Sequence, residues 1–163
     1  METTALKTGA TAPDFTLHNL RNQDVTLSSF FEIGKDVLLS FHPLAWTPVC
    51  EIQMRSLELK KSLFDRFETV ALGMSVDAPF AKIAWAEYMK MTETDMLADF
   101  WPHGEVARRY GIFDEEKGVS GRANFLISRT GQVKFAKVYA MREIPDIEEV
   151  LRFIENDTSR AVA

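Results

Sequence analysis

At 163 residues with 46% hydrophobic side chains, the chain is long enough to bury one substantial core, and no shift in composition marks a second domain. Nineteen basic and 24 acidic residues give a formal charge of −5, which provides no general attraction to nucleic acid or to an anionic membrane surface. We therefore expect a single domain over residues 1–163, with neither nucleic acid nor membrane as a partner.

The sequence also limits targeting, metals and cofactors. No run approaches transmembrane length, and the first residues lack a basic region followed by an apolar secretory core, so we expect a cytoplasmic protein. The single cysteine, Cys50, excludes an intrachain disulfide, and the histidines at 18, 42 and 103 show no metal-ligand spacing. We predict no structural disulfide, no metal and no cofactor.

The chain is expected to begin with a β-hairpin. Residues 13–17 and 25–27 are strand candidates, and the largely polar stretch 19–24 between them is typical of a turn. A break at 34–36 then precedes Val37-Leu38-Leu39-Ser40-Phe41, a nearly continuous apolar run. Such a run is typical of a strand buried on both faces, so we predict that it lies in the middle of a sheet.

The stretch from Pro43 to Cys50 follows that strand and contains the only cysteine. Its two prolines force an irregular turn at the carboxyl end of the strand, where open α/β sheets form their ligand crevices. Thr47 suits a helix N-cap, and Pro48 suits the first helical position. A free thiol has a pKa of roughly 8.5, and a helix N-terminus favours its reactive thiolate form. Cys50 is therefore predicted to be a nucleophile, and the alternative is an inert, buried cysteine.

Apolar side chains recur at helical spacing after Cys50, which predicts an amphipathic helix that ends near Glu68. Cys50 falls near the boundary between the two faces, in the first turn of this helix. Met54 falls among the charged residues of the polar face. The predicted apolar face consists of Ile52, Leu57, Leu59, Leu63, Phe64 and Phe67.

A second strand and helix follow. Residues 69–76 have the pattern of another buried strand, and the stretch 77–79 leads into a helix that extends to Met89. The repeated order of strand and helix predicts a parallel core. Residues 95–99 are a further short strand candidate.

The last part of the chain is predicted to contain a short helix over 105–110 and two strands, 123–127 and 133–139, joined by a turn. A final amphipathic helix opens at Pro145, and the tail from Asn156 is expected to fray. The apolar face of this last helix is formed by Ile147, Val150, Leu151 and Ile154.

The pattern Pro43-x-x-x-Thr47-x-x-Cys50 resembles the active-site signature of the peroxiredoxins, the AhpC/TSA family of thiol peroxidases. The likeness covers most of the chain, from residues 9–17 through 122–127 to the last helix. The stretch Asp99-Phe100-Trp101-Pro102-His103-Gly104, followed by Tyr110-Gly111, looks like the one-cysteine AhpE type. This resemblance implies an α/β thioredoxin-like fold, with a central mixed β-sheet flanked by helices and an N-terminal β-hairpin.

The resemblance also implies a catalytic set. Cys50 would attack a peroxide as the thiolate and become a sulfenic acid. Arg122 would favour the thiolate through its permanent charge and donate hydrogen bonds to the peroxide. Thr47 would hydrogen-bond the peroxide, and Pro43 would shield the thiolate from water. Backbone N–H groups at the helix start would stabilise charge on the peroxide oxygens.

The expected substrates are hydrogen peroxide and organic hydroperoxides. With no second cysteine in the sequence, an external thiol or redoxin must reduce the sulfenic acid of Cys50. The resemblance further implies a homodimer.

Two positions depart from the pattern of the family. Gln53 stands where a glutamate is frequent, and His42 stands where an aromatic residue is frequent. A disulfide oxidoreductase is disfavoured because it usually needs Cys-x-x-Cys, and the corresponding residues here are Thr47-Pro48-Val49-Cys50. A peroxide sensor or thiol-relay module without physiological turnover remains the alternative, since the same Cys50 would serve it.

Overall fold

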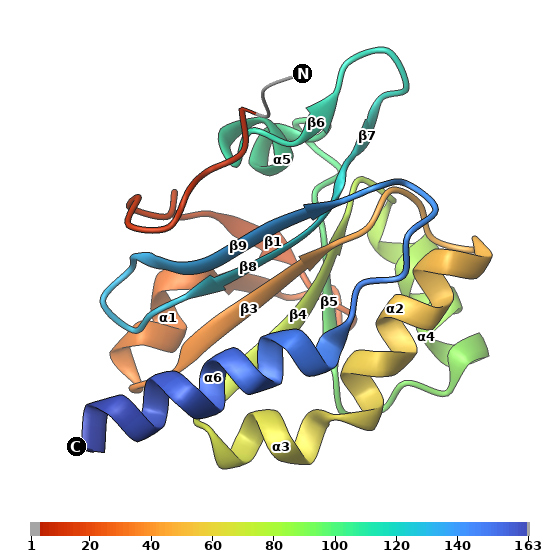
Figure 1. The fold of residues 1–163 in the computed structure, drawn as a ribbon. Helices are drawn as coiled ribbons and strands as arrows, with labels where there is room; N and C mark the ends of the chain where they lie inside the picture. Colours follow the sequence, from red (N-terminus) through yellow and green to blue (C-terminus); the bar gives the residue numbers. More distant parts are fainter. Residues whose placement is uncertain (1–3, 163) are drawn as a thin grey trace.

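The computed structural model describes residues 4–162. Its main sheet contains seven strands in the order β2-β1-β5-β4-β3-β8-β9 (Figure 1). Strands β3, β4 and β5 are parallel neighbours, whereas β8 and β9 run antiparallel, which confirms the expected mixed sheet of a thioredoxin-like fold. The strands are β1 (Thr16–His18), β2 (Asp24–Thr26), β3 (Asp36–Phe41), β4 (Thr69–Ser75), β5 (Asp95–Ala98), β8 (Arg122–Ile127) and β9 (Val133–Tyr139).

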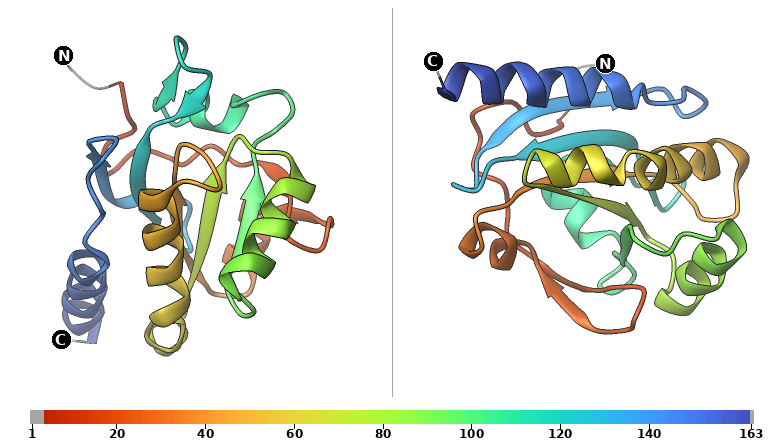
Figure 2. Two further views of the ribbon diagram at one scale, coloured as in Figure 1. Left: turned by 90° about the vertical axis from the view of Figure 1, so that its right-hand side faces the viewer. Right: turned by 90° about the horizontal axis from the view of Figure 1, so that it is seen from below.

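Helices cover both faces of this sheet (Figures 1 and 2). One apolar cluster joins α2, α3, α4 and α6 to one face, and a second joins α1 and α5 to the other. No helix within residues 4–162 is both long enough and apolar enough to span a membrane. The helices are α1 (Leu27–Glu32), α2 (Pro48–Leu59), α3 (Lys61–Arg66), α4 (Pro79–Met89), α5 (Glu105–Arg109) and α6 (Ile147–Val162).

The central strand β3 explains the apolar run that begins at Val37. All six of its residues are buried, because β4 and β8 flank it and helices cover both of its faces. Val37 and Phe41 point into the cluster with α1 and α5, whereas Leu38 points into the cluster with α2. A strand that is buried on both faces has no solvent side, so its sequence does not alternate between apolar and polar residues.

The prediction of one helix from Cys50 to Glu68 was wrong. Helix α2 ends at Leu59, Lys60 leaves helical geometry with ψ of 8°, and α3 begins at Lys61. The predicted apolar face was wrong in part: Leu57 and Phe64 are buried as expected, but Leu59 is 80% exposed and Met54, placed on the polar face, is fully buried. The break at Lys60 gives each of the two helices its own buried face. A single helical period applied across both therefore assigns some residues to the wrong face. The buried residues of α2 are Cys50, Gln53, Met54 and Leu57.

The other elements differ mainly in extent. The N-terminal hairpin is confirmed, with Leu17 opposite Val25 in an antiparallel register. Three short elements were not predicted: α1, and the two-stranded hairpin of β6 (Phe113–Asp114) and β7 (Val119–Ser120). Helix α6 is longer than expected, since it continues past Asn156 to Val162.

Candidate active site

The turn between β3 and α2, residues 42–47, crosses the carboxyl end of the central strand (Figure 1). Thr47 occupies the N-cap position with extended geometry, and Pro48 is the first helical residue, as predicted. The Thr47 side chain does not cap the helix; its Oγ1 donates to the Leu44 carbonyl at 2.8 Å. This bond braces the turn and leaves lone pairs on the hydroxyl oxygen free to accept from a substrate.

Cys50 lies in the first turn of α2 and is a free cysteine with 1% of its surface exposed. Its surroundings include apolar residues of the α2 cluster, such as Ala45 and Met54. The sulfur is nevertheless not enclosed by hydrocarbon alone, because Nη1 of Arg122 approaches Sγ to 3.4 Å. A buried cation that donates to sulfur favours the negatively charged thiolate over the neutral thiol.

Arg122 is held from two sides. Its Nη1 also donates to Oε1 of Gln53 at 2.7 Å, and its Nε and Nη2 donate to the Met141 carbonyl at 3.1 and 2.6 Å. Gln53 in turn donates from Nε2 to Ser40 Oγ at 2.8 Å and to the Phe41 carbonyl at 3.0 Å. The guanidinium is therefore fixed in direction before any substrate arrives, and the bracing side chain is neutral.

The structure brings two of the four predicted catalytic residues into direct contact, Cys50 and Arg122. The other two, Pro43 and Thr47, lie in the adjacent turn, where Pro43 is buried and Thr47 is half-buried. Together the four residues occupy the carboxyl edge of β3 and the start of α2 and β8. This edge is where parallel-sheet proteins form ligand crevices.

Sequence reasoning missed Lys82, which is 1% exposed and lies near the start of α4. Its Nζ donates to Ser75 Oγ at 2.7 Å and lies 3.3 Å from Nε2 of the buried His42. Burial lowers the pKa of Lys82 to about 7, against the opposing attraction of nearby negative groups. Burial, followed by the charge of Lys82, also holds the pKa of His42 well below its usual range.

A signal for the burial of Lys82 was present in the sequence. Lys82 precedes three buried residues of α4 at helical spacings of three, four and seven, namely Trp85, Ala86 and Met89. Residues at these spacings share one face of a helix. Lysine is rarely found on a buried face, so this spacing alone does not predict a buried Lys82.

Comparisons with known proteins agree with this geometry. The sequence model of the AhpC/TSA family matches residues 8–136. The chain belongs to the AhpC/TSA family. It is a peroxiredoxin, a thiol-dependent peroxidase, and its single cysteine fits the one-cysteine type. The resemblance stated from the sequence is thereby confirmed.

Among curated relatives, alkyl hydroperoxide reductase E of Mycobacterium tuberculosis is 39% identical over 86% of this chain and 91% of its own length. A peroxiredoxin of Thermoplasma volcanium is 33% identical over 90% of this chain and 72% of its own. Among solved structures, Mycobacterium tuberculosis AhpC superimposes with a TM-score of 0.87 at 21% identity, covering 98% of this chain and 97% of the other. The reduced 2-Cys peroxiredoxin of Plasmodium vivax gives 0.85 at 27% identity, with coverages of 94% and 83%. The structures confirm the thioredoxin-like fold.

A cavity of about 360 Å³ in this peroxiredoxin opens beside Thr47 at the start of α2. The ring of Trp46 packs against the ring of Tyr88 from α4, with centroids 5.3 Å apart, and both rings line the cavity. Trp46 and Tyr88 are exposed at their outer sides. Thr47 is the member of the predicted catalytic set that lines this cavity.

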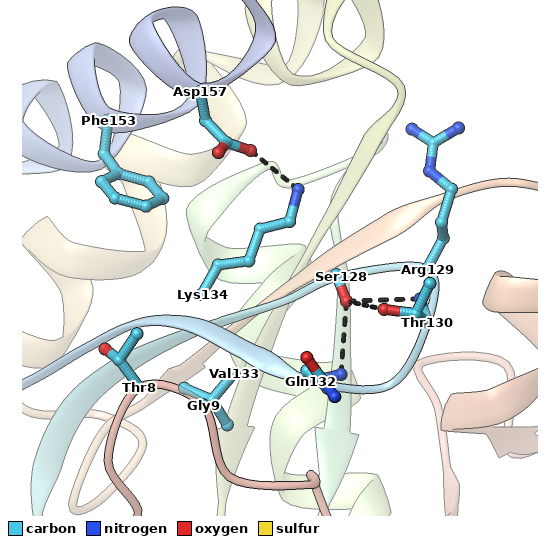
Figure 3. Close-up of a pocket in the computed structure, with 10 residues that line it drawn as sticks. All are labelled: Thr8, Gly9, Ser128, Arg129, Thr130, Gln132, Val133, Lys134, Phe153 and Asp157. Carbon is cyan, nitrogen blue, oxygen red and sulfur yellow. Dashed lines mark hydrogen bonds and ion pairs between the residues drawn. The ribbon is translucent and has the colours of Figure 1, made fainter. Parts of the chain in front are cut away.

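A larger cavity, of about 500 Å³, lies at the turn between β8 and β9 (Figure 3). Lys134 reaches across it to Asp157 of α6 at 2.8 Å, and the hydroxyls of Ser128 and Thr130 bond each other at 2.6 Å. This turn follows the end of β8, whereas Cys50 lies near the start of that strand, so the cavity is at the opposite end of the sheet. None of the predicted catalytic residues lines it.

Proposed function

We propose that this peroxiredoxin reduces hydrogen peroxide and organic hydroperoxides by a one-cysteine mechanism, in which Cys50 cycles between thiolate and sulfenic acid. The contact of 3.4 Å between Arg122 Nη1 and Cys50 Sγ is the observation that carries this proposal. A guanidinium keeps its charge across the accessible pH range, so it favours the thiolate under all working conditions.

In the first step the Cys50 thiolate attacks one peroxide oxygen in line with the O–O bond. The S–O bond forms as the O–O bond breaks, so sulfur is oxidised by two electrons and the peroxide is reduced. The leaving oxygen takes a proton and departs as water or an alcohol. Sulfur ends the step as a sulfenic acid.

The surrounding groups assist this displacement. The fixed guanidinium of Arg122 donates hydrogen bonds to the peroxide. Thr47 accepts a hydrogen bond from the peroxide O–H, while its own hydroxyl continues to donate to the Leu44 carbonyl. Backbone N–H groups at the start of α2 stabilise charge that moves onto the oxygens. Pro43 shields the thiolate and stiffens the turn. The site thus positions and polarises the O–O bond before it breaks.

The sulfenic acid is reduced from outside the chain, because Cys50 is its only cysteine. An external low-molecular-weight thiol or a redoxin attacks the sulfenic sulfur, a mixed disulfide forms, and water leaves. A second thiol then attacks the mixed disulfide and releases Cys50. The name of the mycobacterial relative, alkyl hydroperoxide reductase, supports an organic hydroperoxide as one substrate.

The proposed assembly is a homodimer of single-domain subunits located in the cytoplasm. Support for a dimer comes from large apolar side chains exposed at the active-site end, including Phe80 at 71% and Trp101 at 80%. Exposed apolar patches of this kind commonly mark protein interfaces.

Turnover is the test of the proposed function. The chain supplied with a peroxide and a candidate thiol or redoxin should consume peroxide over many cycles, and Cys50→Ser should abolish this activity. Mass spectrometry should find one added oxygen on Cys50 after peroxide alone, and a mixed disulfide after the thiol is added. Rapid oxidation that no thiol reverses would favour a peroxide sensor instead. Oxidation as slow as that of free cysteine would refute both functions.

A further inference from the structure

Four buried or partly buried polar side chains form a connected network behind the active-site turn. Lys82 contacts Ser75 Oγ at 2.7 Å and His42 Nε2 at 3.3 Å. Ser75 Oγ donates to Asp77 Oδ2 at 2.7 Å. We call these residues, His42, Ser75, Asp77 and Lys82, the Lys82 network.

The Lys82 network is connected to the active-site turn, residues 42–47, at two points. His42 is bonded covalently to Pro43, and its ring also packs against Trp85 with centroids 5.4 Å apart. Asp77 Oδ2 accepts the backbone N–H of Ala45 at 2.8 Å. A movement of Lys82 is therefore transmitted to both sides of Pro43, the residue proposed to shield the thiolate.

Lys82 also lies on the buried face of α4, and its neighbours on that face, Trp85 and Ala86, share an apolar cluster with Cys50. The charged or titratable groups that act on Lys82 are Asp77 after β4, Cys50 on α2, Asp95 on β5 and His42 after β3. Within residues 4–162, no carboxylate lies at ion-pair distance from Lys82, since Asp77 engages Ser75 and Ala45 instead. Among these groups Asp77 attracts the ammonium of Lys82 most strongly, and the charge of Cys50 comes next, ahead of Asp95. A thiolate at Cys50 therefore helps to balance the buried ammonium.

We propose that Lys82 is a positioning residue of the peroxidase reaction, which holds the active-site turn from behind and stabilises the Cys50 thiolate when its amine is protonated. This inference rests on the proposed function, because it assigns Lys82 a part in the same reaction. Arg122 supplies a permanent charge from the β8 side of the sulfur. Lys82 adds a titratable charge from the α4 side.

The pH dependence follows from the sign of this charge. The pKa of Lys82, lowered by burial to about 7, places the change from ammonium to amine near neutral pH. Below that pH Lys82 is an ammonium, and its positive charge favours the thiolate. This is also the pH range in which the high proton concentration most strongly disfavours the thiolate. Above that pH the positive charge of Lys82 is lost, and its attraction for the thiolate is lost with it. The contribution of Lys82 is therefore largest in acid and fades in base.

The experiment compares Lys82→Met and Lys82→Gln with the wild-type protein. Stopped-flow oxidation of Cys50 by hydrogen peroxide, and the ultraviolet absorbance of its thiolate, are followed from about pH 5 to about pH 9. Lys82→Gln keeps a polar group near Ser75, which separates charge from position. Lys90→Met is the matched control, because Lys90 is an exposed lysine directly after the same helix.

Lys82→Gln should slow oxidation about tenfold near pH 6 and less than twofold near pH 9, with the thiolate titration displaced to higher pH. Lys82→Met, which also loses the contacts with Ser75 and His42, should be slower than Lys82→Gln at both pH values. Lys90→Met should match the wild type throughout. A loss by the same factor at every pH in Lys82→Gln, or no loss in either variant, would overturn the proposal. If the wild type itself reacts slowly, the proposed function fails, and the thiolate titration still shows whether Lys82 acts on Cys50.

Discussion

Gln53 braces Arg122 without adding a charge beside the sulfur. It accepts from Arg122 with its amide oxygen and donates from its amide nitrogen to Ser40 and to the Phe41 carbonyl. The glutamate expected from the family pattern could accept from Arg122 in the same way, but an ionised carboxylate cannot donate. The neutral amide also leaves the guanidinium charge free to act on the thiolate and the peroxide. Glutamine in place of the frequent glutamate therefore still holds Arg122 in position, but without a negative charge.

Replacement of the Gln53 amide by a carboxylate should lower the free energy of unfolding, by an amount that depends on pH. In Gln53→Glu the ionised side chain would face the Phe41 carbonyl as a second acceptor, so we expect a loss of roughly 1–3 kcal/mol in the free energy of unfolding near pH 8. Protonation restores a donor, so the loss should shrink near pH 5. Denaturant unfolding at both pH values measures this. The exposed Gln23→Glu serves as control, and an equal loss at both pH values would contradict the account.

Lys82 should lower stability while it serves the reaction. Its folded-state pKa of about 7 lies below the ordinary lysine value of 10.5, so the unfolded chain binds more protons between these values. The stability of the wild type should therefore rise as pH increases above 7. Lys82→Met lacks this dependence.

We expect Lys82→Met to be more stable than the wild type near pH 6, and the difference to narrow by roughly 2 kcal/mol by about pH 9. Chemical denaturation at a series of pH values gives this comparison. A difference that stays constant with pH would mean that the amine is not titrating inside the fold.

At the scale of single elements, the sequence predicted strands better than helix ends. The buried strands β3 and β4 are recognisable in the sequence as continuous apolar runs, because both faces of each strand are covered. The break at Lys60 has no glycine or proline to mark it, so apolar spacing alone joined α2 to α3. Similarly, the six residues of α1 are too few to establish a helical period.

Helix α5 depends on a carboxylate that comes before it in the chain. Asp99 is buried and accepts the N–H groups of Val106 and Ala107 at 3.1 and 2.9 Å. These are donors that a short helix leaves unsatisfied at its first turn. Asp99→Ala should therefore lower the free energy of unfolding by roughly 1–2 kcal/mol. Thermal or denaturant unfolding tests this, with the exposed Asp24→Ala as control, and equal stability of the two variants would contradict it.

At the scale of the whole molecule, the sheet assembles the site from distant segments. Cys50 and Arg122 are 72 residues apart in sequence. They meet because β8 pairs antiparallel with β3 and places Ala123 opposite Phe41, so β8 starts at the edge where β3 ends. Spacing in the sequence could identify Cys50 and its turn, but nothing in spacing singled out Arg122. Its position was expected only from the family resemblance, and Lys82 was not expected at all.

The proposed dimer can be tested at the active-site end of the molecule. Phe80 projects from the start of α4 and is largely exposed, so a charge there should weaken an interface built on these apolar side chains. We expect Phe80→Glu to shift the mass measured by light scattering from dimer toward monomer. Ile33→Glu, at the opposite end of β3, should leave the dimer intact. A wild-type monomer at micromolar concentration would reject the dimer.

The central claim is that Arg122 activates Cys50, and the rate of the first chemical step tests it most directly. Stopped-flow oxidation of Cys50 by hydrogen peroxide should be about a hundredfold slower in Arg122→Met than in the wild type, because that variant loses both the charge beside sulfur and the donors for the peroxide. Arg21→Met, which removes an exposed arginine, should react as fast as the wild type. If folded Arg122→Met oxidises at the wild-type rate, Arg122 does not activate the thiol, and the account is wrong.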